Sequence, residues 1–133
     1  ARIPDTHLVM HGSSSVPQDW LKIINDFGGD MGQTYGVPVE EIQEGIKHGV
    51  RKVNIDTDLR MASTGAVRRH LIENTSNFDP RKFLKEATNA MSGICAARFE
   101  AFGSAGNADK VKVSSLDTMS QKYLSGELDA QIK

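Results

Sequence analysis

The chain has 133 residues, of which 38% are hydrophobic and 25% charged, and its formal net charge is −1. This composition is typical of a globular domain, and the near-neutral charge excludes a strong long-range attraction to nucleic acid or anionic membranes. No apolar stretch approaches the roughly 20 residues that a membrane-spanning helix needs. We therefore expect neither a nucleic-acid partner nor a membrane partner.

Cysteine usage and the first residues indicate the compartment. The single cysteine, Cys95, excludes a disulfide within the chain and fits a reducing environment. Residues 1–5 contain neither an initiator methionine nor the apolar segment of a signal peptide. We expect a cytoplasmic protein, with an organelle matrix as the alternative if a transit peptide has been lost.

Two short apolar segments, residues 7–10 and 50–55, predict strands. Helical patterns follow each of them, the second over residues 59–72. This order is that of two consecutive β/α units of a parallel sheet. Because two parallel strands do not form a stable sheet alone, we expect the chain to be part of a larger α/β domain.

The segment between the strands predicts two helices and a flap. Ser15 is expected to cap the first helix, whose apolar residues recur at helical spacing as far as Phe27. Residues 30–36 predict a flap with Gly32 and Gly36 as hinges. The second helix follows the flap and ends before the second strand.

The C-terminal half predicts a long apolar helix and a polar tail. Residues 81–102 are apolar nearly all round, which predicts a helix buried inside a larger protein or at a subunit interface. Residues 76–80 are expected to form a break and a new helix cap, and Cys95 to be a small core residue within the helix. After a linker over 103–109, residues 115–133 predict a helical tail.

The sequence HGSSS over residues 11–15 follows the first strand and offers an imidazole, backbone amides and hydroxyls. His11 could reach a metal ion, and a hydrogen-bonded structural histidine is the alternative. Gly12, Ser13 and Ser14 lead into a helix N-terminus, which favours an anion, while a cap that binds only water is the alternative. A serine hydrolase is excluded, because the chain lacks the Gly-x-Ser-x-Gly nucleophile elbow.

A zinc site usually needs three protein ligands, and His11 is only one. His7 lies at the other end of the first strand, and His48 and His70 fall at helix positions that are expected to be exposed. A metal ion here would therefore use ligands that this chain does not contain.

The sequence NIDTD over residues 54–58 repeats the arrangement at the second strand. Strand alternation sends Asn54 and Asp56 to one side and Ile55 to the other, and Thr57 could cap the next helix and donate to a phosphate. Capping alone is the alternative. Two neighbouring strand ends with such loops fit the phosphate site that follows strands 7 and 8 of (β/α)₈ barrels.

Arg98 lies inside the apolar helix. Because an unpaired buried guanidinium is costly, it must pair with a carboxylate or reach a ligand anion. A structural ion pair is the default expectation.

Three segments resemble the class II, metal-dependent fructose-bisphosphate aldolases of the Calvin-cycle-type subgroup. They are LVMHGSSS (8–15), YGVPVEEIQEGIKHGVRKVNIDTDLR (35–60) and MSGICAARFEAFGSAGNA (91–108). The resemblance implies a (β/α)₈ TIM barrel, of which residues 1–109 would be the C-terminal portion with the last two β/α units. Residues 110–133 would then be a C-terminal helical tail, and the helix at 81–102 an interface helix of a homo-oligomer, a dimer or tetramer.

The resemblance also implies the chemistry: reversible, zinc-dependent cleavage of fructose 1,6-bisphosphate to dihydroxyacetone phosphate and glyceraldehyde 3-phosphate, with the rest of an aldolase chain as partner. Another divalent metal could replace zinc, and a monovalent cation often lies beside the phosphate. His11 would be a metal ligand, Asn54 a catalytic residue at the enediolate, and Arg98 a contact to the other phosphate, commonly in the partner subunit's site. The ketose-phosphate site would comprise Gly12, Ser13, Ser14, Asn54, Ile55, Asp56 and Thr57.

The sequence departs from many members of the family at Ser13 and Ser15, where glycine is common. The acid/base aspartate, the glutamate of the mobile loop and two further metal histidines are not found in the chain, so we expect the isolated 133 residues to be inactive and to bind no zinc tightly. Two other readings stay open. One is a non-catalytic phosphate-binding or assembly fragment, and the other is a sister aldolase acting on sedoheptulose or tagatose bisphosphate.

Overall fold

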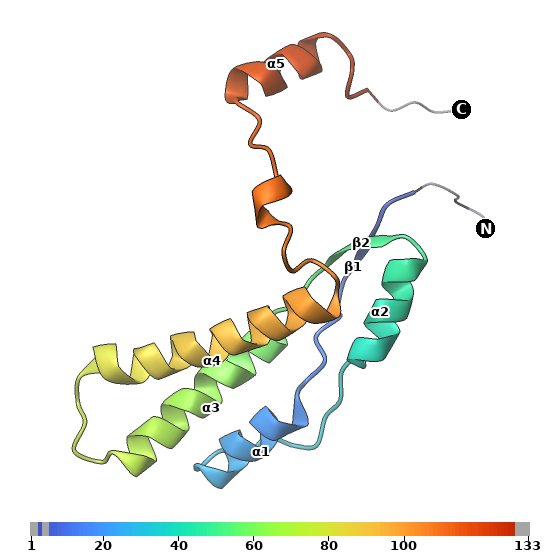
Figure 1. The fold of residues 1–133 in the computed structure, drawn as a ribbon. Helices are drawn as coiled ribbons and strands as arrows, with labels where there is room; N and C mark the ends of the chain where they lie inside the picture. Colours follow the sequence, from blue (N-terminus) through green and yellow to red (C-terminus); the bar gives the residue numbers. More distant parts are fainter. Residues whose placement is uncertain (1–2, 4–5, 130–133) are drawn as a thin grey trace.

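A two-stranded parallel sheet is the centre of the computed structural model, which describes residue 3 and residues 6–129 (Figure 1). Strand β1 (Leu8–Met10) pairs with strand β2 (Val50–Val53), and Met10 lies opposite Val53. Both predicted strands are present and parallel. Because parallel strands end at the same edge of a sheet, the loops after β1 and β2 meet there.

Helices follow each strand, as predicted. Their bounds are α1 (Gln18–Asp26), α2 (Val39–Lys47), α3 (Thr57–Glu73), α4 (Pro80–Ala101) and α5 (Leu116–Leu124), with a short 3₁₀ helix at Ala108–Lys110. The predicted tail is helical only in α5, and its residues 130–133 lie outside the described part, as do residues 1–2 and 4–5 of the N-terminal segment. No helix in the described part is long and apolar enough to cross a membrane.

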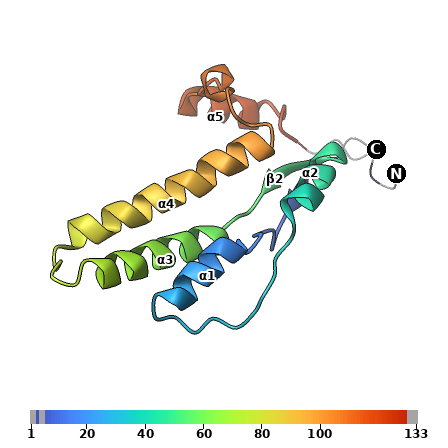
Figure 2. The ribbon, with the colours of Figure 1, turned by 60° about the horizontal axis from the view of Figure 1, so that its bottom comes forward.

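Helices α3 and α4 form an antiparallel pair that lies side by side in both views (Figures 1 and 2). Helix α1 packs against α3, and a cluster of Val16, Leu21, Ile24 and Met61 is buried where the loop before α1 meets these two helices. On the other side, α2 buries Ile42 completely and lies against β2. These contacts hold the two strand-end loops on rigid elements.

Both predicted helix caps at the sheet edge are wrong. Helix α1 begins at Gln18, after Pro17, and the Ser15 hydroxyl donates to the Asp58 carboxylate at 2.9 Å instead of capping it. Helix α3 begins at Thr57, so Thr57 is its first residue; the N-cap is Asp56, whose side chain makes no capping hydrogen bond. The Ser14 hydroxyl, from the other loop, accepts the first amides of α3 instead, because the sheet brings the two loops together.

Helix α4 is much less buried within this chain than its apolar sequence predicts. Only Ala87 is fully buried, whereas Leu84 and Phe99 are 53% and 58% exposed. Cys95 is exposed, so its predicted place in a core is wrong for the described part of the chain. The reason is geometric, since α3 covers one face of α4 only, and an interface on the remaining surface stays a prediction.

The predicted cap of α4 is confirmed and gives a pH-dependent test. The Asp79 carboxylate accepts the Arg81 amide at 3.0 Å and also binds the Arg81 guanidinium. Side-chain hydrogen bonding from Arg81 holds the pKa of Asp79 below its ordinary value of 3.8. Because the pKa of Asp79 is lower in the folded state, the carboxylate stabilises the fold at pH values above its ordinary pKa. This stabilisation is lost as the pH falls through the pKa of the folded state.

Asp79→Ala is therefore expected to lower the Tm at neutral pH, by loss of the cap and of the charge at the helix N-terminus. The difference from the unmodified protein should shrink as the pH falls below about 3.8, where the carboxylate becomes protonated. Thermal unfolding followed by circular dichroism between about pH 2 and about pH 7 measures it. A difference that stays constant over this range would contradict the prediction.

Candidate functional site

The loops after β1 and β2 are joined by hydrogen bonds from three consecutive serines. The Ser13 hydroxyl lies 3.0 Å from the Met10 carbonyl oxygen and 2.8 Å from that of Asn54, and the residue is fully buried. Strand β2 ends at Val53, earlier than predicted, and the carbonyl oxygen of the next residue, Asn54, accepts the Ser13 hydroxyl. Neither the side chain nor the backbone of Ser13 is exposed in this chain, so the residue holds the two loops together from beneath the surface.

Ser14 connects the first loop to the N-terminus of α3. Its hydroxyl oxygen accepts the amides of Asp56 and Thr57 at 3.2 and 3.1 Å. The hydroxyl proton makes no hydrogen bond to the described residues, so it remains available to an acceptor. Ser14 can therefore donate its hydroxyl proton to an anion, and the positive end of the α3 dipole strengthens this contact.

An open groove of about 610 Å³ lies over this junction. Its lining residues are Gly12, Ser14, Lys52, Val53, Asn54, Ile55, Asp56 and Thr57. Six of the nine predicted site residues are thus brought together, while His11, Ser13 and Arg98 do not line the groove. Gly12 has φ +62° with open space around its Cα, so its backbone can be approached closely.

Lys52 is a cation of this groove that the sequence analysis missed. Its Nζ donates to the Asn54 side-chain oxygen, and its side chain is exposed. The signal was present, because strand alternation places Lys52 on the same side of β2 as Asn54.

His11 and Asn54 contact each other across the ends of the two strands. The Asn54 amide nitrogen lies 2.8 Å from His11 Nδ1, which accepts its proton. The exposed His11 ring is a possible metal donor at this edge. Among the described residues no group of three His, Cys, Asp or Glu side chains could hold a metal ion, so they do not form a complete metal centre.

The other histidines lie elsewhere, and His70 is half-buried where the sequence predicted it to be exposed. His48 is exposed and pairs with Glu44 at 2.9 Å on α2, and His70 contacts Asn77 at the end of α3. His7 precedes β1, at the opposite end of that strand from His11.

Arg98 forms an ion pair within the chain. Its Nη2 lies 3.1 Å from Asp58 Oδ2 and 2.7 Å from the Ser15 hydroxyl oxygen, and its side chain is only 15% exposed. The buried Nε atom has no hydrogen-bond partner in the described part of the chain. Asp58 is fully buried, and the sequence analysis did not select it. Its place in the first turn of α3, two residues after Asp56, was the only available signal.

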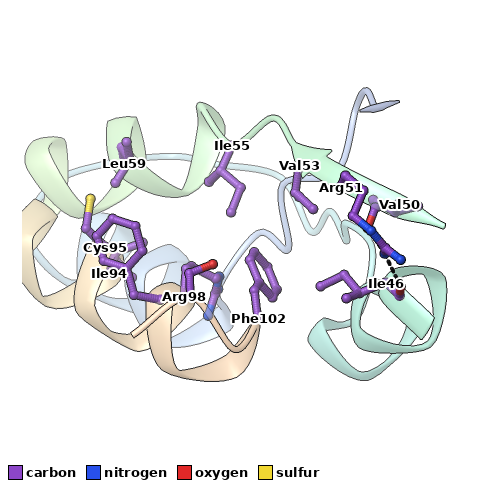
Figure 3. A pocket seen from close by; sticks show the side chains of 12 residues that line it. Ile46, Val50, Arg51, Val53, Ile55, Leu59, Ile94, Cys95, Arg98 and Phe102 are labelled. Carbon is purple, nitrogen blue, oxygen red and sulfur yellow. Dashed lines mark hydrogen bonds between the residues drawn. The ribbon is translucent and has the colours of Figure 1, made fainter. Parts of the chain in front are cut away.

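A second cavity, of about 470 Å³, lies between β2, the start of α3 and α4. Figure 3 shows Ile55 and Phe102 pointing into it, with Ile94 and Leu59 nearby. Ile55 therefore lines this apolar cavity with its side chain, and its backbone is the part that can serve a phosphate. Because the walls are mainly apolar, this cavity is a poor site for a sugar phosphate.

Comparisons with known proteins identify the family of this chain. The family model described as "Fructose-bisphosphate aldolase class-II" matches residues 1–107. Proteins named fructose-bisphosphate aldolase from Stutzerimonas stutzeri and Pseudomonas aeruginosa are 70% and 69% identical over 132 residues, which are 99% of this chain and 37% of each relative. One of the same name from a Nostoc species is 60% identical over 129 residues, which are 97% of this chain and 36% of that relative. The chain spans little more than a third of the length of these relatives, and it belongs to the class II fructose-bisphosphate aldolase family.

Proposed function

We propose that the protein catalyses the zinc-dependent, reversible aldol cleavage of fructose 1,6-bisphosphate to dihydroxyacetone phosphate and glyceraldehyde 3-phosphate. This chain would supply one metal ligand and the ketose-phosphate site. The observation that carries the proposal is the groove, where both predicted phosphate loops lie together beside Asn54, which contacts His11. The named relatives support the reaction class.

The groove has the chemistry that a phosphate needs. The Ser14 hydroxyl has a proton to donate, the Gly12 backbone is open to approach, and the N-terminus of α3 points its amides at Ser14. Lys52 adds a positive charge along the same groove. We propose that Gly12, Ser13 and Ser14 bind the ketose phosphate together with residues 55–57, and that a monovalent cation accompanies it.

His11 would be one of the zinc ligands, and ligands outside this chain would complete the centre. When bound, zinc supplies a Lewis acid that polarises the ketose carbonyl. Asn54 lies next to His11, so its amide N–H can donate to the substrate oxygen that becomes negative as the C3–C4 bond breaks. Lys52 holds the amide oxygen of Asn54 and His11 Nδ1 accepts one N–H of the amide, which leaves the second N–H for this contact.

Arg98 would contact the second phosphate of the substrate. Its unpartnered, buried Nε supports a further partner, because guanidinium donors seldom stay unsatisfied in a protein interior. The ion pair with Asp58 uses only the Nη2 atom. Arg98 could thus keep this pair and still reach a phosphate with its other donors.

We further propose that residues 1–109 are the C-terminal portion of a (β/α)₈ barrel and that residues 110–133 are a helical tail. Two paired parallel strands with helices after each support the barrel. The exposed apolar side chains of α4, Leu84 and Phe99 among them, support an interface helix in a homo-oligomer. Sedimentation of the complete gene product as a monomer would contradict that interface.

The proposal is tested by assaying fructose 1,6-bisphosphate cleavage with the complete gene product that contains this chain. We expect activity that a chelator abolishes and added zinc restores, and weaker activity on tagatose 1,6-bisphosphate and sedoheptulose 1,7-bisphosphate. The isolated 133 residues should bind no zinc with nanomolar affinity, since they hold a single ligand. Cleavage that is insensitive to chelator, or no cleavage under any condition, would overturn the proposal.

A further inference from the structure

We propose that Asp58 is a positioning residue for the phosphate groove, an inference that rests on the proposed function. Its buried carboxylate holds the backbone of Ser15 and Val16 in place. Because Ser14 directly precedes these residues, the same contacts fix the position of Ser14 in the groove. Asp58 does not touch the ligand itself, because it is fully buried and does not line the groove.

The Asp58 carboxylate contacts the loop after β1 and the guanidinium of Arg98. Oδ2 accepts the Ser15 amide at 3.1 Å and the Ser15 hydroxyl at 2.9 Å, and Oδ1 accepts the Val16 amide at 2.9 Å. Arg98 Nη2 completes the set at 3.1 Å. The carboxylate therefore acts as an internal anion that binds two consecutive amides, and these two amides are not available to a phosphate.

The backbone that Asp58 holds is one that the sequence disfavours. Val16 has φ +54°, a left-handed conformation that is rare for a β-branched residue. Such a conformation persists only where the surroundings enforce it. The two amides that donate to Asp58 are contacts at this turn that can do so, together with the Gln18 side chain, which donates to the Val16 carbonyl oxygen at 2.8 Å.

Ser14 lies directly before this turn, so a change in the turn moves it. Its hydroxyl must stay within reach of the Asp56 and Thr57 amides, at 3.2 and 3.1 Å, to remain in the groove. Loss of the Asp58 contacts would release Ser15 and let Ser14 leave that place. The expected consequence is weaker binding of the phosphate, with little effect on the bond-breaking step.

The test is Asp58→Asn in the complete gene product. Asparagine keeps the size of aspartate, but its NH₂ group cannot accept an amide proton, so one side of the contact is lost. We expect the Kd for inorganic phosphate and the KM for fructose 1,6-bisphosphate to rise about tenfold, with kcat within about threefold of the unmodified value. Phosphate binding is measured by calorimetric titration and also by competitive inhibition.

The direction in which phosphate affinity changes in Asp58→Asn distinguishes a positioning role from an effect of the negative charge alone. If Asp58 acted only as a nearby negative charge, its removal would tighten phosphate binding. If it only stabilised the fold, the Tm would fall while the folded enzyme kept its phosphate affinity. Either result with a folded variant would overturn the proposal. Asp26→Asn is the matched control, since Asp26 is an exposed partner of Lys22 on α1, and it should leave both constants unchanged.

Hydrogen exchange of the unmodified protein keeps the proposal testable if Asp58→Asn does not fold. The amides of Ser15 and Val16 should be protected although they lie in a loop, because they donate to a buried carboxylate. Rapid exchange at both would overturn the proposal. Absence of aldol cleavage by the unmodified protein would instead overturn the proposed function, and the phosphate titration would still decide the role of Asp58.

Discussion

His11→Ala should lower the rate of fructose 1,6-bisphosphate cleavage by roughly 10³-fold, because a Lewis acid contributes several kcal/mol to the transition state and each 1.36 kcal/mol is worth a factor of ten. The physical cause is loss of the proposed metal ligand that follows β1. Metal content per protein, measured by mass spectrometry after dialysis, should fall together with the activity. High added zinc should restore part of the rate.

The matched control is His48→Ala. His48 is exposed on α2, where it pairs with Glu44, and it lies outside the groove. We expect this variant to keep its metal and its activity. Full metal content in His11→Ala, or a rate like that of the control, would show that His11 is a structural histidine held by Asn54 and not a ligand.

The position of the site was predictable because it follows from two short patterns. An apolar run that ends in small or polar residues predicts a strand with a functional loop, and the chain has two such runs joined by helices. Parallel pairing then brings the loops together without any further information. The Asp79 cap of α4 was predictable for a similar reason, since its partner is only two residues away.

The fates of Ser13, Ser14 and Ser15 were not predictable, although the three residues are identical and consecutive. Ser13 binds two carbonyl oxygens, Ser14 binds the amides at the start of α3, and Ser15 binds the Asp58 carboxylate. Almost all of these partners lie about 40 residues away in the chain. Which serine meets which partner depends on strand register and on the left-handed turn at Val16, and neither leaves a local signal.

Asp56 and Asp58 show the same limit. Both follow β2 with similar spacing, yet Asp56 is exposed and pairs with Arg60, whereas Asp58 is fully buried. The difference arises once α3 begins at Thr57, because helical geometry turns side chains two positions apart to different faces. The exposure of α4 has another cause, since burial depends on what surrounds a helix and the sequence of the helix does not specify that.

Gly36→Ala should raise the KM for fructose 1,6-bisphosphate by about 10–100-fold, because displacements near 1 Å at a binding site have effects of this size. A methyl group on Gly36 would stand 2.7 Å from the Ser15 carbonyl carbon and closer still to the Ser14 carbonyl oxygen. The same oxygen accepts the Val37 amide at 3.1 Å. Since the clash is with backbone, the loop that carries Ser14 has to move. Steady-state kinetics and phosphate titration measure the loss.

Gly32→Ala is the control that shows whether residues 30–36 support the phosphate loop by packing or act as a mobile flap. Gly32 lies in the same segment and a methyl group there would meet open space, so we expect its KM within about twofold of the unmodified value. The sequence predicted both glycines to be hinges, and a mobile flap would make both substitutions harmful by stiffening it. Neither glycine has a positive φ, so alanine is allowed in the backbone conformation of both and only the space differs. An equal rise in KM in both variants would support the hinge hypothesis. A rise in Gly36→Ala alone would show that this segment supports the phosphate loop by packing against it.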